Sequence, residues 1–180
     1  MTTRRWIAVA LVAVAAVALS IGIIKLVSGS SSSTDESSSA RALRQIVRTA
    51  TPAVDPFVGL TETSDLAVGG LCRHVVIADS EAERVEGLRQ RSDIGSYDGM
   101  LFVFAAPTTV GFTMSTVPVG LDIGFYRADG TLVSTTKMAP CAKAENQCPI
   151  YQADGPFSYA LETLSGKLPG GSLSARSCPS

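Results

Sequence analysis

The chain has 180 residues and a formal net charge of −1, and this length suits one domain with an extension. The near-neutral charge argues against nucleic acid as a partner, because phosphate binding requires a clustered positive surface. Hydrophobic residues make up 46% of the chain, and their excess is concentrated near the N-terminus.

Residues 6–27 form an apolar stretch that predicts one transmembrane helix, since such a helix needs about 20 apolar residues. Arg4 and Arg5 precede it, so the positive-inside rule places residues 1–5 in the cytoplasm and the C-terminal domain outside. The expected location is the cell membrane, with a single pass. A cleaved signal peptide ending at "ALS" or "VSG", and a twin-arginine signal at "TRRWI", are alternative interpretations.

Residues 28–56 are expected to be a Ser-rich linker followed by a short amphipathic segment. The stretch "SGSSSSTDESSSA" has no large apolar side chain to bury and is typical of a flexible spacer. Leu43, Ile46 and Val47 then recur at helical spacing before Pro52. Three arginines share this segment. They could attract anionic lipid head groups, although a solvated helix face is the favoured interpretation.

Residues 57–180 are expected to form a mainly β domain, a small jelly-roll-like sandwich or barrel with one short helix. Ser80 and Glu83 fit a capping box, and Gly87 marks the end of that helix. The Asp-Gly pair in "ADG" predicts a hairpin between two strands. The strand-like segments are "LCRHVVIAD", "MLFVFA", "TVGFTM", "VGLDIGFY", "TLVSTTKM", "PFSYALET" and "GSLSARS".

The four cysteines predict two disulfides, because an even count in a domain expected outside the cytoplasm implies disulfide bonds. The ends of "CAKAENQC" can meet readily, which would pair Cys141 with Cys148 and leave Cys72 for Cys178. A zinc site is disfavoured because the cysteines lack closely spaced ligand pairs. No C-x-x-C redox motif occurs.

The sequence shows no recognisable catalytic machinery. His74 is the one histidine, and no G-x-S-x-G elbow accompanies it, so a surface position in a strand is the favoured interpretation. A carboxylate pair could form among Asp79, Asp98, Asp122 and Glu162, although spacing in the sequence does not show that any two approach each other. No catalytic residue, metal ligand or cofactor is therefore expected.

Four segments in order resemble a known family. They are "ADSEAERVEGLRQR", "YDGMLFVF", "GFTMSTVPVGLDIGFYRADGTLV" and "YALETLSG". Together they resemble domain of unknown function 192 (DUF192) from about Leu71 to the C-terminus, and "APCAKAENQCPIY" resembles the extracytoplasmic members. The resemblance implies a compact jelly-roll-type β fold with one early helix, often behind an export signal or anchor, and it implies no established activity.

The third segment departs from the usual family pattern. The resemblance leads us to expect Trp, Lys and Asn at the positions of Thr113, Ser115 and Thr116, and a second proline at Gly120. A lysine-dependent reaction is therefore not expected. The candidate site residues lie within these motifs; they are Asp122, Met114, Thr116, Asp98 and Tyr151.

Asp122 interrupts an apolar run, and the favoured interpretation is that it accepts N–H donors from the preceding turn "STVPVG". For the whole protein we expect a membrane-anchored binding module of the cell envelope. Its partner would be an envelope glycan or a membrane protein. An envelope hydrolase using carboxylates and an accessory subunit of a membrane complex are the alternative functions.

Overall fold

The computed structural model describes residues 36–179, and residues 1–35 and 180 fall outside the described part. The predicted anchor at 6–27, the cytoplasmic flank at 1–5 and the Ser-rich start of the linker therefore lie outside the described residues. Within residues 36–179, no helix combines the length and the hydropathy that a membrane crossing needs.

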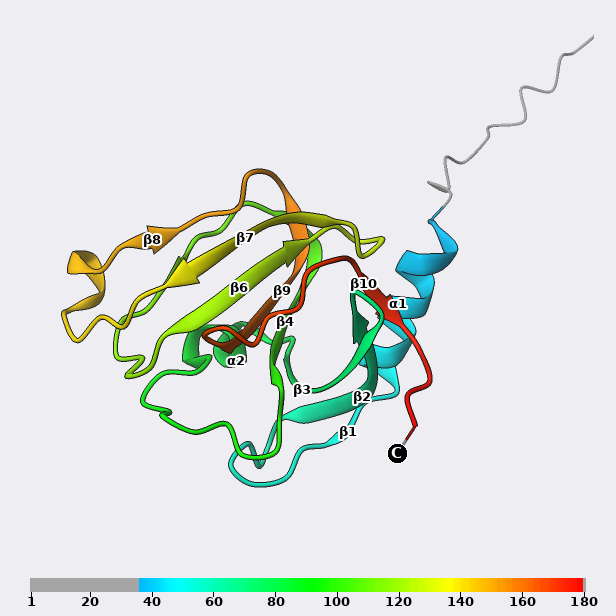
Figure 1. The fold of residues 1–180 in the computed structure, drawn as a ribbon, viewed down its shortest axis with the longest axis horizontal. Coiled ribbons are helices and arrows are strands. Elements are labelled where there is room, and N and C mark those ends of the chain that lie inside the picture. Colours follow the sequence, from blue (N-terminus) through cyan, green and yellow to red (C-terminus); the bar gives the residue numbers. More distant parts are fainter. Residues whose placement is uncertain (1–35, 180) are drawn as a thin grey trace, which may run out of the picture. The chain divides into compact units, whose positions relative to one another are not determined.

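The described residues form a mainly β unit, as predicted (Figure 1). The main sheet has the order β1-β2-β3-β4-β9-β6-β7, with β10 pairing with β2. Its strands are β1 Thr51–Pro52, β2 Thr61–Val68, β3 Leu71–Ala78, β4 Gly99–Thr108, β6 Leu121–Tyr126, β7 Leu132–Met138, β9 Phe157–Leu164 and β10 Leu173–Ala175. A separate ribbon pairs β5 (Phe112–Thr113) with β8 (Ile150–Tyr151).

Strand direction departs from the jelly-roll pattern at one place. β3 and β4 pair in parallel, with Val75 opposite Gly99, whereas the other strand pairs described here are antiparallel. Parallel neighbours need a crossover connection, and residues 79–98, which contain the capped helix, supply it. Jelly-roll strands pair antiparallel, so this connection separates the fold from that expectation.

Two apolar cores lie on opposite faces of the main sheet. On β6, Leu121, Ile123 and Phe125 face the first core, while Tyr126 faces the second. This division follows from the alternation of side chains along a strand. Gly124 allows the ring of Tyr126 to pack closely, since a Cβ there would lie 2.9 Å from the ring.

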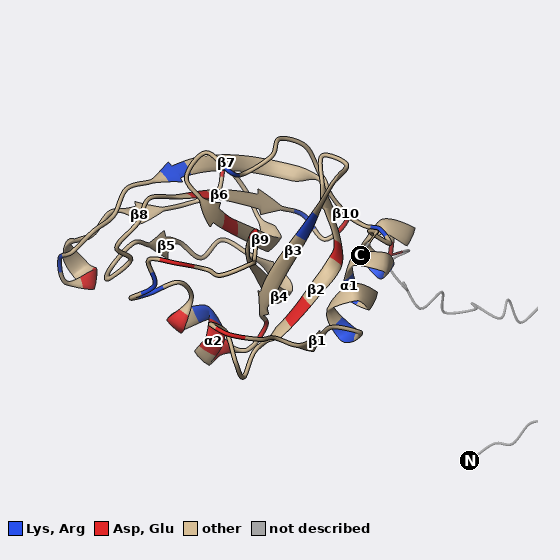
Figure 2. Cartoon of the chain, turned by 60° about the horizontal axis from the view of Figure 1, so that its bottom comes forward, with Lys and Arg blue, Asp and Glu red and all other residues tan. Residues whose placement is uncertain are grey.

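Helix α1 (Ser38–Arg48) confirms the predicted amphipathic helix. Leu43 and Ile46 are buried in the second core beside Leu173 of β10. Its arginines lie on the exposed side, and Figure 2 shows these basic positions along the helix. The packed unit therefore begins before Phe57, because an amphipathic helix buries its apolar stripe wherever a core accepts it.

Two short helical segments complete the elements. The helix α2 (Glu81–Glu86) has the predicted capping box at Ser80 and Glu83 and ends at Gly87. A 3₁₀ turn, η1, spans Glu145–Gln147.

The disulfides join the cysteines that the sequence analysis paired. Cys72 of β3 bonds to Cys178, and Cys141 bonds to Cys148 around η1, each with a Cα–Cα distance of 5.9 Å. The first bridge ties the segment after β10 to β3, and the second closes a short loop.

Candidate functional site

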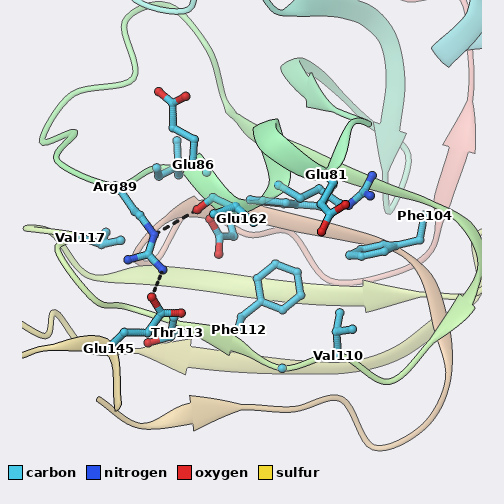
Figure 3. A pocket seen from close by; sticks show the side chains of 16 residues that line it. Glu81, Glu86, Arg89, Phe104, Val110, Phe112, Thr113, Val117, Glu145 and Glu162 are labelled. Carbon is cyan, nitrogen blue, oxygen red and sulfur yellow. Dashed lines mark hydrogen bonds and ion pairs between the residues drawn. The ribbon is translucent and has the colours of Figure 1, made fainter. Parts of the chain in front are cut away.

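A cavity of about 420 Å³ lies between α2 and β5 (Figure 3). This volume falls in the usual range of small-molecule sites. Its lining residues come from α2 and the turn after it, from β4, β5 and β9, and from η1. The lining includes Glu81, Arg84, Val85, Glu86, Arg89, Phe102, Phe104, Val110, Phe112, Thr113, Glu145 and Glu162.

The capping box fixes one wall of the cavity. The Ser80 hydroxyl accepts the Glu83 amide at 3.2 Å, and the Glu83 carboxylate accepts the Ser80 amide at 2.9 Å. These bonds satisfy amides that a helix start leaves free, so even a helix of six residues has a defined first turn. Glu81, Arg84 and Val85 thereby reach the rim of the cavity.

Phenylalanines form the apolar wall. The rings of Phe102 (β4) and Phe112 (β5) meet edge to face with centroids 5.2 Å apart. Phe112 also packs against Phe125 at 5.6 Å, which anchors the short β5 strand on the first core. Aromatic pairs in this geometry are preferred, so these rings hold a fixed wall.

Arg84 closes the wall at one end. Its guanidinium lies 5.0 Å from the centroid of Phe104 and donates to the Val103 carbonyl at 2.9 Å. It also donates to the Asp79 carbonyl just before α2. The stacking and both bonds orient the side chain between α2 and β4.

Arg89 closes the other end. Its guanidinium donates to the carbonyls of Val85 at 3.1 Å and Ser115 at 3.2 Å, and pairs with Glu145 at 3.0 Å. Glu145 opens η1, inside the loop that Cys141–Cys148 closes. The short disulfide therefore holds the acidic partner of Arg89 at the cavity.

Glu162 of β9 is the buried acid of the cavity. Its side chain points into the space from the sheet, and the residue is 5% exposed. Among the described residues the carboxyl group has neither a hydrogen bond nor an ion pair. Burial alone raises its pKa to about 8, so the group carries a proton at neutral pH.

Asp122 lies away from this cavity, on the opposite face of β6 from Leu121 and Ile123. Its carboxylate accepts the Gly166 amide at 2.7 Å and the Ser165 hydroxyl at 3.3 Å. The expectation that its donors come from "STVPVG" is wrong, because the turn after β9 folds back beside it. Asp122 thus ties a turn to the sheet, with different donors from those expected.

Met114 and Thr116 adjoin the cavity wall without lining it. Met114 is fully buried in the first core. Thr116 has φ +60° and joins two segments: its amide donates to Cys141 at 3.1 Å, and its carbonyl accepts from Gln90 at 2.8 Å. The backbone of this segment therefore links the short disulfide loop to the turn after α2.

Asp98 and Tyr151 also lie outside the cavity lining. Asp98 is exposed and accepts the His74 amide at 2.8 Å, where β3 meets the start of β4. The Tyr151 hydroxyl accepts the Ala139 amide at 3.1 Å. The Nε2 atom of His74 lies 3.3 Å from the Glu62 carboxylate, and His74 is not among the residues that line the cavity.

Sequence reasoning named Glu162 only among four acids and missed Arg84, Arg89 and Glu145. One signal was available, because "ALETL" places an acid inside a strand flanked by apolar residues. The arginines gave no signal, since both lie in or just after a helix with many charges. Among residues 36–179, no group of three His, Cys, Asp or Glu side chains could hold a metal ion.

The sequence pattern of a known family covers the whole cavity. The DUF192 family, described as "Uncharacterized ACR", matches residues 64–172. The chain belongs to the DUF192 family. The match includes α2, β5 and Glu162, whereas α1 lies before it. The resemblance read from the four sequence segments is confirmed.

Two solved structures are similar to this DUF192 protein. A protein of unknown function from Novosphingobium aromaticivorans is 27% identical, with a TM-score of 0.55 over 69% of this chain and 92% of that one. A "putative transcription regulator" from Sinorhizobium meliloti is 28% identical, with a TM-score of 0.50 over 58% of this chain and 82% of that one. No curated protein sequence matches the chain.

Proposed function

We propose that this DUF192 protein is a binding module of the cell envelope and that it holds a small ligand in the cavity between α2 and β5. The observation that carries the proposal is the cavity itself, about 420 Å³, whose lining combines a phenylalanine wall with six charged side chains. Ligand sites combine apolar walls with polar groups that fix the orientation of the ligand.

The proposed location is the outer side of the cytoplasmic membrane, with the chain anchored through residues 6–27. The apolar stretch and the preceding arginines support an anchor. The two disulfides support an oxidising compartment, because such bonds rarely persist in the cytosol.

Thr113 offers a direct test of the binding function. Its side chain lines the cavity at the position where the resemblance leads us to expect tryptophan. Thr113→Trp should fill the cavity with a large side chain. The full-length protein in detergent would be used to capture ligands from envelope extract, scored for small molecules, glycan and protein.

We expect the wild-type protein to retain a ligand that Thr113→Trp releases, with both proteins melting at similar temperatures. Equal capture by the two proteins would show that the cavity is not the binding site. Capture of one membrane protein by both would favour an accessory subunit instead.

An envelope hydrolase is a second candidate, and one observation favours it. Glu162 carries a proton at neutral pH, because burial raises its pKa to about 8, and a general acid needs that state. Glu81, Glu86 and Glu145 line the same cavity and could supply a second carboxylate. Release of reducing ends from envelope glycan by the wild type, and not by Glu162→Gln, would support this activity.

A further inference from the structure

The carboxyl group of Glu162 faces the cavity without a partner among the described residues. The residue is 5% exposed, and burial is the one cause that raises the pKa of its carboxyl group. A buried carboxylate is stable only when it is paired or hydrogen-bonded, and otherwise it takes up a proton. Since the side chain points into the cavity, a ligand there can supply the missing partner (Figure 3).

The charged groups facing the cavity favour a positive partner. Glu81, Arg84 and Glu86 come from α2, Arg89 from the turn after it, and Glu145 from η1. Arg89 is paired with Glu145 at 3.0 Å, and its other donors bind carbonyls. Glu86 is also paired, 3.4 Å from Arg91 outside the cavity.

Of the remaining groups, Glu81 offsets Arg84, whose Nη1 already donates to two carbonyls. Glu162 is uncharged until it releases its proton, and the acids of the lining then outnumber its arginines by four to two. A cationic ligand would then meet a carboxylate with free acceptors, whereas an anionic ligand would meet the excess of acids.

The aromatic and aliphatic side chains of the cavity wall suit the apolar part of a cationic ligand. Phe102 and Phe112 border the cavity, and aromatic faces attract cations. Arg84 already shows this interaction on Phe104. Val85 and Val110 line the cavity and are exposed, at 65% and 47%, so the mouth offers apolar contacts to a ligand stem.

We infer that the cavity binds a small organic ammonium ion on an apolar stem, with Glu162 as its counter-ion. This inference rests on the proposed binding function and names the chemical class of its ligand. Binding moves one proton: the Glu162 carboxyl releases its proton to solvent, and the carboxylate then pairs with the ammonium group.

The proton release gives the inference a pH signature. Because burial raises the pKa of Glu162 to about 8, affinity for the cation should rise about tenfold per pH unit below that value and then level off. A neutral ligand that accepts a hydrogen bond from the protonated acid would show the opposite trend.

The experiment compares four probes on the full-length protein by titration calorimetry, and three of them share a phenyl group and differ in charge. They are 2-phenylethylamine, which is a cation throughout the pH range used, 2-phenylethanol, which is neutral, and phenylacetate, which is an anion. Nα-acetyl-lysinamide presents the same ammonium group on a peptide stem and tests whether its source is a protein side chain. Titrations in two buffers of different ionisation enthalpy count the released protons without any substitution.

Glu162→Gln keeps the shape and removes the charge, and Asp154→Asn, at an exposed acid outside the cavity lining, is the control. We expect the cation to bind best and with proton release, and Glu162→Gln to lose at least about tenfold in affinity together with the pH dependence. Asp154→Asn should change affinity by less than about threefold, since exposed charges contribute little. Preference for the lysine probe over 2-phenylethylamine would still support the counter-ion role.

Two results would overturn the inference while leaving the binding function in place. One is binding of 2-phenylethanol at least as tight as that of the cation, and the other is unchanged cation affinity in Glu162→Gln. If none of the probes binds and Thr113→Trp captures the same ligands from extract as the wild type, both the inference and the proposed function fail.

Discussion

Asp122 and Glu162 are two buried acids with different surroundings. Asp122 is 6% exposed and accepts two hydrogen bonds from the turn after β9. Glu162 is 5% exposed and has no such donor among the described residues. Both are acids inside largely buried strands, in "LDI" of β6 and "ALETL" of β9. The donors of Asp122 lie 43 and 44 residues away, so sequence alone could not tell the structural acid from the cavity acid.

Substitution of Asp122 should therefore affect stability and leave the cavity intact. Asp122→Ala leaves the Gly166 amide and the Ser165 hydroxyl without their acceptor, and we expect a loss of about 1–3 kcal/mol in the free energy of unfolding. Asp122→Asn keeps one acceptor oxygen and should lose less. Urea unfolding measures the stability of both variants. Midpoints equal to that of the wild type would refute the structural role of Asp122.

At the scale of elements, local signals were predictable and distant contacts were not. The capping box at Ser80 defined α2, and the Asp-Gly turn defined the β6–β7 hairpin, because each depends on neighbours in sequence. Strand β2 was missed, since the register shift between Thr63 and Leu66 breaks the alternation of its burial. The place of α1 in the second core depends on β10, which lies over 100 residues later.

The short disulfide is the element that we expect to couple stability to the cavity. Cys141–Cys148 closes the loop that holds Glu145 against Arg89. Replacing both cysteines with serine should cost about 2–3 kcal/mol in the chain-entropy model and should loosen η1. Faster amide exchange at Glu145–Gln147 and weaker ligand binding are the measurable consequences.

Cys72–Cys178 is the matched control for that variant. It closes a loop with a sequence separation of 106, so its removal should cost more, about 4–5 kcal/mol. It lies outside the cavity lining, so ligand affinity of the folded protein should stay unchanged. Equal loss of affinity in both double variants would show that the short loop has no specific part in binding.

At the scale of the whole molecule, the parallel β3–β4 pair decides where the cavity forms. The crossover between these strands carries α2 onto the face where β9 presents Glu162. Without the crossover, α2 would not cover that acid. The sequence gives no local sign of strand direction, which is why the mainly β class was predictable and the cavity was not.

The buried acid should also shape the pH dependence of global stability. The pKa of Glu162 rises from 4.5 to about 8 through burial. Between these values the folded chain holds a proton that the unfolded chain has released, so stability is highest below the lower value and falls as pH rises to about 8. The slope from this group is at most about 1.4 kcal/mol per pH unit. The hydrogen bond from Tyr97 lowers the pKa of Glu62, so the stability that Glu62 contributes is lost as pH falls into the acid range instead.

Glu162→Gln should remove this slope, because an amide does not titrate. Urea unfolding of the wild type and the variant at several pH values gives the difference between their free energies of unfolding, in which other groups largely cancel. We expect the free energy of unfolding of the variant, relative to that of the wild type, to increase steadily from about pH 5 to about pH 8. At higher pH the difference should stay constant. Parallel stability curves across that range would mean that Glu162 is ionised in the folded protein, and the cavity would then already hold a carboxylate before any cation binds.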